Sequence, residues 1–145
     1  MAVAGYPAEC AGVRAAKNAA NKDRAKTMWI ASKYGFFSIV KKNGGWHIRA
    51  RNRTDLPLLQ KAVGGEFGKL VVHTTMDADY ISRVFIPDSI PGAVSDIMRA
   101  LGDSVDYSNF KNHIHDNADQ QDKLPAYSRL WSHMHAYQSE RDSQT

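Results

Sequence analysis

Hydrophobic and polar positions alternate along the chain between residues 28 and 52, which is the pattern of short β-strands. The runs 28–32, 36–42 and 45–52 are each rich in aromatic and β-branched residues. Asn43-Gly44 stands between the second and third runs. Because a two-residue type I′ turn needs positive φ at both central positions, Asn-Gly at this place predicts a β-hairpin.

Beyond residue 53 the apolar spacing becomes mainly helical. Thr54 is expected to be the N-cap of a short helix with Pro57 in its first turn, and Gly64-Gly65 to end it. Residues 70–75 and 80–86 predict two further strands around a turn at 77–79. Apolar stripes then predict three helices, which carry residues 90–101, Tyr107 to Ile114, and Leu124 to Met134.

The element order is therefore β-β-β-α-β-β-α-α-α, which predicts an α+β domain. We expect an antiparallel sheet of about five strands with helices packed on one face, and the inner β-α-β-β-α portion is compatible with a ferredoxin-like split. Residues 1–27 predict a basic, Ala-rich arm that is partly helical or disordered, residues 28–138 one domain, and residues 139–145 a polar tail. The aromatic residues of the last two helices are expected mostly in the core: Tyr107, Phe110, Tyr127, Trp131 and Tyr137.

The charge is divided unevenly along the chain. The net charge of +4 combines eleven Lys and Arg against two acidic residues in residues 1–53 with eight against thirteen in residues 54–145. Such a division favours partners that carry negative charge, unless the basic first half pairs with the acidic second half. The single cysteine, Cys10, cannot form an internal disulfide, no run is long and apolar enough to cross a bilayer, and no secretory signal is apparent, so we expect a cytoplasmic protein.

The third predicted strand carries the main candidate site. Its alternation sends Trp46, Ile48 and Ala50 to the core and the intervening basic side chains to the other face. The planar guanidinium group of arginine binds phosphates with two hydrogen bonds. A nearby Tyr34 or Phe36 could stack on bases. The residues expected to bind nucleic acid or an acidic partner are Lys33, Tyr34, Lys41, Lys42, His47, Arg49, Arg51 and Arg53.

Two structural explanations compete with this hypothesis. The solvent-exposed face of a sheet must carry polar residues, and the acidic residues further along the chain could pair with the arginines. Arg83 alternates with the apolar Ile81 and Phe85, which predicts a paired or snorkelling arginine instead of a ligand contact.

Other kinds of site have less support. The pairs His113/His115 and His133/His135 are two residues apart, so on a helix each pair points to opposite sides and neither chelates a metal from one face. No nucleophile elbow or Walker loop is present, so catalysis is unmotivated and no cofactor or metal is expected. If the last helices are only half covered, the face of Tyr127 and Trp131 is the expected protein-docking patch.

From Met28 onward the chain resembles a small, uncharacterised family of bacterial, plasmid and phage proteins. The resemblance rests on residues 29–40, Arg49-Ala50-Arg51 with Asp55-Leu56, Asp79-Tyr80 with Arg83, the Asp106-Tyr107-x-Asn109-Phe110-Lys111 motif, and Trp131. It spans most of residues 28–137 and implies no activity.

We therefore expect a non-enzymatic module that binds nucleic acid or a nucleoprotein complex. The alternative is a phage- or plasmid-encoded regulator that inhibits a host enzyme or a defence complex by binding it. A metal-dependent hydrolase is a third, weaker hypothesis.

Overall fold

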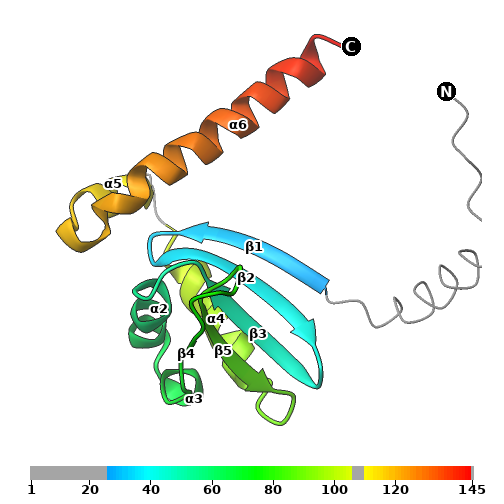
Figure 1. Ribbon diagram of the computed structural model, residues 1–145, viewed down its shortest axis with the longest axis vertical. Coiled ribbons are helices and arrows are strands. Elements are labelled where there is room, and N and C mark those ends of the chain that lie inside the picture. The colour runs from blue at the N-terminus through cyan, green and yellow to red at the C-terminus, as the bar shows by residue number, and fades with distance from the viewer. Residues whose placement is uncertain (1–25, 106–109, 145) are drawn as a thin grey trace, which may run out of the picture.

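The structure is a computed structural model that describes residues 26–105 and 110–144. It contains one five-stranded antiparallel sheet with the order β1-β2-β3-β5-β4 (Figure 1). The strands are β1 (Lys26–Ser32), β2 (Gly35–Lys42), β3 (Gly45–Ala50), β4 (His73–Thr74) and β5 (Ser82–Pro87). The predicted α+β class and the antiparallel sheet of about five strands are confirmed.

The hairpin of β2 and β3 is present where the sequence predicts it. Asn43 and Gly44 have φ values of 52° and 75°, as a type I′ turn requires. The pairing of Val40 with His47 and of Ile39 with Ile48 fixes the register. β3 ends at Ala50, two residues before the predicted end.

A split β-α-β connection follows the hairpin. The chain leaves β3 through α2 (Asp55–Val63) and α3 (Gly65–Gly68), forms β4, and returns as β5 between β3 and β4. Thr54 takes the N-cap position of α2, but it makes no capping bond with its side chain. Asn52 Oδ1 instead accepts from the backbone N–H groups of Thr54 at 3.1 Å and Asp55 at 2.9 Å.

The predicted strand 70–75 is reduced to two residues. Leu70 and Val72 pack against the core from a segment outside the strand, so burial and not strand pairing explains their apolar character. The short helix α3 is not predicted from the sequence. Gly64 and Gly65, with φ values of 65° and 57°, turn the chain out of α2 and into it.

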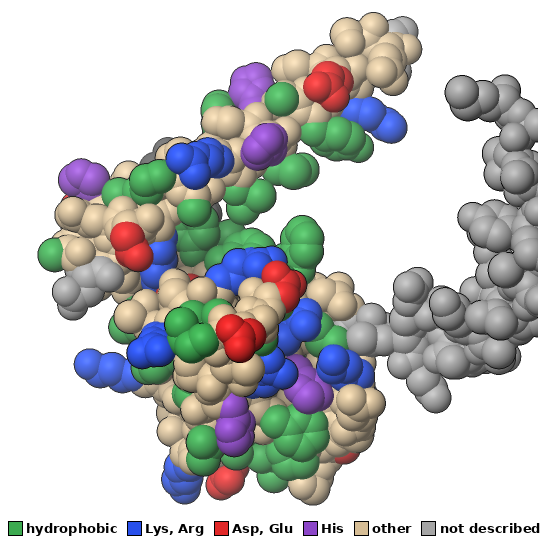
Figure 2. Space-filling model, in the orientation of Figure 1, with side chains coloured by type: hydrophobic (Ala, Val, Ile, Leu, Met, Phe, Trp, Pro, Cys, Tyr) green, Lys and Arg blue, Asp and Glu red, His purple; other side chains and the backbone are tan. Residues whose placement is uncertain are grey.

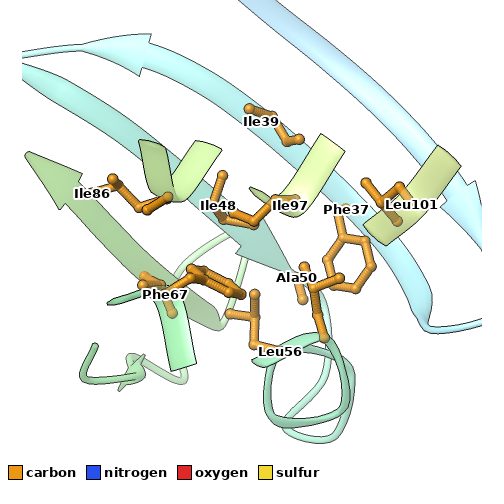
Figure 3. Packing of buried hydrophobic residues seen from close by; sticks show 12 residues of the cluster. Phe37, Ile39, Ile48, Ala50, Leu56, Phe67, Ile86, Ile97 and Leu101 are labelled. Atoms are coloured by element: carbon orange, nitrogen blue, oxygen red, sulfur yellow. The ribbon is translucent and has the colours of Figure 1, made fainter. Parts of the chain in front are cut away.

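The core lies between the sheet and α2 and α4 (Gly92–Asp103). Figure 3 shows side chains of β2, β3 and β5 meeting those of the helices in one cluster. Phe37, Ile48, Leu56, Ile86 and Ile97 are fully buried, and each contributes about 1.5–3 kcal/mol by burial. One face of the sheet is covered in this way.

The C-terminal segment joins the domain through few contacts. It comprises α5 (Phe110–His115), the 3-10 helix η2 (Ala118–Lys123) and α6 (Leu124–Asp142). Lys123 Nζ forms a buried ion pair with Asp55, and the Tyr127 hydroxyl donates to the carbonyl of Ser32 at 3.3 Å. Beyond this point α6 extends away from the sheet (Figure 1) and reaches into the segment predicted as a polar tail.

The expectation that the aromatic residues of the last helix are buried is right for Tyr127 and wrong for two others. Trp131 is 59% exposed and Tyr137 is 53% exposed. The reason is geometric, because α2 and α4 already cover the helix-facing side of the sheet. Tyr107 and the side chain of Phe110 lie outside the described residues.

Candidate functional site

The face of the sheet opposite α2 and α4 has no described helix packed on it. We call it the open face; its side chains are Trp29, Phe36, Ser38, Val40, Lys42, His47, Arg49, His73, Arg83 and Phe85. Part of it is covered, because Ser38 and Val40 are buried and the buried Tyr80 ring lies against Arg49. Figure 2 shows basic, acidic, histidine and hydrophobic side chains gathered together over the sheet on the side toward the viewer. Alternation along β2, β3 and β5 produces this face, because their other side chains enter the core.

One line of side chains crosses the whole sheet. The register places Trp29 opposite Ser38, Ser38 opposite Arg49, Arg49 opposite Arg83, and Arg83 opposite His73. We call these five residues the cross-strand row. With neighbouring strands about 4.8 Å apart, the row is about 19 Å long.

Arg49 and Arg83 stand side by side at the centre of this row. Arg49 Nη2 donates to Ser38 Oγ at 2.7 Å, and its guanidinium carbon lies 4.4 Å from the centre of the Tyr80 ring. The Nε atoms of both arginines are buried and have no hydrogen-bond partner among the described residues. No described carboxylate forms an ion pair with either of them. Two like charges directly opposite each other on neighbouring strands destabilise the sheet.

The other predicted arginines are held differently. Arg51 Nη1 pairs with Asp79 Oδ1 at 2.8 Å, and this hydrogen bond is the largest cause that raises the Arg51 pKa. Arg53 lies beyond β3, where its Nη2 donates to Met76 Sδ at 3.1 Å. The structure therefore separates the three arginines of the predicted binding set, because β3 ends at Ala50 and Asp79 neutralises Arg51, as the alternative of pairing with downstream acids had it. Of the three, only Arg49 stands on the sheet without a carboxylate partner.

Aromatic side chains flank the arginine pair. Trp29 is 67% exposed on the edge strand, and its ring centre lies 6.2 Å from that of Phe36. Next to the arginine pair along β3 and β5, the rings of His47 and Phe85 lie 5.0 Å apart, and Phe85 is 38% exposed. The open face thus combines cations with exposed aromatic surface.

Both burial and the cations of the open face affect the pKa of His47. Its pKa is lowered from 6.5, first by desolvation and then by the charges of Lys42, Arg49 and Arg83. The lowered pKa keeps the imidazole neutral at pH 7 in the absence of a bound anion.

Three residues of the predicted binding set lie elsewhere. Lys33 Nζ lies 5.5 Å from the centre of the Tyr34 ring, and both residues border a hollow of about 440 Å³ beside α2 and α4. Lys41 lies over Trp46 on the helix-facing side and pairs with Asp88 at 3.8 Å. None of the three therefore adds to the open face, whereas Lys42 and His47 do.

Arg83, expected from the sequence to be a paired or snorkelling arginine, lies opposite Arg49 and has no carboxylate partner among the described residues. Its alternation with Ile81 and Phe85 makes this side of β5 resemble a buried side, but the core residues are Val84 and Ile86. The available signal was the apolar pair Val84 and Ile86 at two-residue spacing, which in the structure lies opposite Ile48 and Trp46 on β3. That Arg83 faces Arg49 depends on strand register, which a single sequence does not display.

The described part of the chain gives little support for other kinds of site. It contains no group of three His, Cys, Asp or Glu side chains arranged to hold a metal. No helix within residues 26–105 and 110–144 has both the length and the apolar character to cross a membrane. A second exposed surface is the apolar side of α6, where Leu130, Trp131, Met134 and Tyr137 are accessible.

Comparison with models of protein families, with curated proteins and with solved structures finds no match for this chain. The family resemblance described above therefore stays a prediction.

Proposed function

We propose that this chain binds nucleic acid by holding its phosphodiester backbone on the open face of the sheet. The observation that carries the proposal is the Arg49–Arg83 pair, two cations in register with no carboxylate partner among the described residues. A phosphate between them would replace repulsion by two charge-assisted hydrogen bonds. The pair then stabilises the complex and not the free protein.

The surroundings of the pair favour a polymer over a small anion. The cross-strand row is about 19 Å long by strand spacing, which is far more than one phosphate occupies. Exposed Trp29 and Phe85 add surfaces on which bases can stack. A site for inorganic phosphate alone would have no use for these rings.

A salt titration with matched variants tests the proposal. Binding of a labelled oligonucleotide should weaken steeply with salt, because released counterions drive the association. Arg49→Gln together with Arg83→Gln should reduce the slope of log K against log salt by about 1.4, which corresponds to two lost contacts on a single strand. The control is Arg99→Gln, which removes an exposed arginine from α4.

The slope of the Arg99→Gln control should stay unchanged. If the double variant and the control behave alike, or if the chain binds no oligonucleotide at low salt, the proposed function is wrong. Circular dichroism of each variant verifies that the fold is intact.

The apolar side of α6 favours a second function, that of a protein-binding regulator. Trp131, Met134 and Tyr137 form an exposed stripe at helical spacing on a helix that extends from the domain. Capture of a host protein that survives nuclease treatment and is lost with Trp131→Ala would support this function. Capture that disappears with nuclease would support the nucleic-acid function instead.

A further inference from the structure

We propose that the open face selects single-stranded over double-stranded nucleic acid, with the strand laid along the cross-strand row and one base stacked on Trp29. This inference rests on the proposed function and specifies the ligand of the same face.

The direction of the ligand follows from the register. Trp29 and Arg49 are separated by two strand spacings, about 10 Å, and Arg83 lies one spacing further in the same line. A ligand that contacts the indole and both guanidinium groups must therefore run across the strands and not along them. Open sheets that bind RNA hold two or three bases on a comparable surface.

Trp29 provides a surface that only an unpaired base can use. Its indole is 67% exposed, and Phe36, 6.2 Å away, supports it within the sheet. In a duplex each base already stacks on its neighbours and pairs with the other strand, so its ring faces are not available. A single strand can offer a free ring face to the indole, whereas a duplex can offer only phosphates.

The arginine pair is placed to hold the phosphate next to that base. Arg49 is fixed by Ser38 Oγ and by the Tyr80 ring, so its position depends on neighbours that are themselves buried. Phe85, in the adjacent residue pair with His47, offers a second ring beside the guanidinium groups. A neighbouring base that reaches from the bound phosphate along the strands would thus meet the Phe85 ring.

The test compares a labelled single-stranded oligonucleotide with a hairpin duplex of the same composition, using the full chain and fluorescence anisotropy. We expect the single strand to bind at least about tenfold more tightly. Trp29→Ala should weaken single-strand binding by about tenfold, in the range measured for loss of one stacked base, and leave duplex binding unchanged. The control Met98→Ala removes an exposed apolar side chain from α4, on the other side of the sheet, and should change neither.

Two outcomes separate this inference from the proposed function. If duplex and single strand bind equally, or if Trp29→Ala weakens neither or both alike, selection through Trp29 is refuted, although the loss of binding in Arg49→Gln/Arg83→Gln still supports the proposed function. If neither nucleic acid binds, both are refuted. Trp29→Phe provides a further variant, since it keeps a smaller ring and should retain most of the preference.

Discussion

Replacing Arg83 by Gln should stabilise the free protein while it weakens oligonucleotide binding. The two guanidinium groups stand on directly opposed positions, where Cβ atoms are about 5 Å apart. Coulomb's law gives a repulsion of about 0.7 kcal/mol for charges about 6 Å apart in water, and a larger value where the surroundings exclude water. Like charges opposite one another on paired strands cost a similar amount.

We therefore expect Arg83→Gln to raise the free energy of unfolding by about 0.5–1 kcal/mol at low salt. For a domain of this size that corresponds to roughly 2–5 °C in Tm. Urea denaturation followed by circular dichroism measures the change. At 1 M NaCl, where the Debye length is about 3 Å, wild type and variant should become nearly equal.

An Arg83→Gln variant that is no more stable than wild type would contradict the electrostatic basis of the proposed function. If Arg83→Gln is neutral or destabilising at every salt concentration, while Arg99→Gln behaves the same way, the two arginines do not repel one another appreciably. An anion bound between them would then relieve no repulsion.

Two further predictions concern titration and burial. The folded-state pKa of His47 lies below 6.5, so the unfolded chain binds a proton on this imidazole more readily than the folded protein does. The free energy of unfolding should therefore be highest above pH 6.5 and fall as the pH drops through the folded pKa. Urea denaturation at pH 8 and at pH 5.5 should show a smaller loss of stability for His47→Gln than for wild type. Equal losses would contradict this assignment. Lys123→Met should lower the free energy of unfolding by about 3–5 kcal/mol, because it leaves the carboxylate of Asp55, which is 2% exposed, without its cation. The control Lys61→Met, on the surface of α2, should cost less than about 0.5 kcal/mol in the same denaturation measurement. Similar costs for the two lysines would show that the buried pair does not hold the C-terminal segment.

The buried ion pair illustrates how a local pattern and a distant contact combine. The sequence places Asp55 in the first turn of α2, where its charge suits the helix dipole. In the structure its Oδ2 also accepts from the backbone N–H of Phe36 at 3.1 Å, and its other oxygen meets Lys123. Gly35 is required at this junction, because a Cβ there would collide with the Asp55 carboxylate.

The candidate site likewise combines features that the local sequence predicts with features that depend on distant residues. The two-residue alternation of β3 correctly separates Ile48 from His47 and Arg49, since it reflects the local geometry of an extended chain. It does not reveal that Asp79 neutralises Arg51, because that acid comes from a loop 28 residues away along the chain. The partner of Arg49 on the sheet is likewise set by β5 and not by β3.

The sequence by itself determined the elements that depend on neighbouring residues. These include the hairpin at Asn43-Gly44, whose φ values follow from the two residue types, and the apolar stripe of α4, whose spacing matches one helical face. Only the tertiary structure decided that Arg83 stands opposite Arg49 and that α6 leaves the sheet with Trp131 exposed. Register and docking follow from which apolar faces bury one another across long sequence separations, and a local pattern carries no record of that choice.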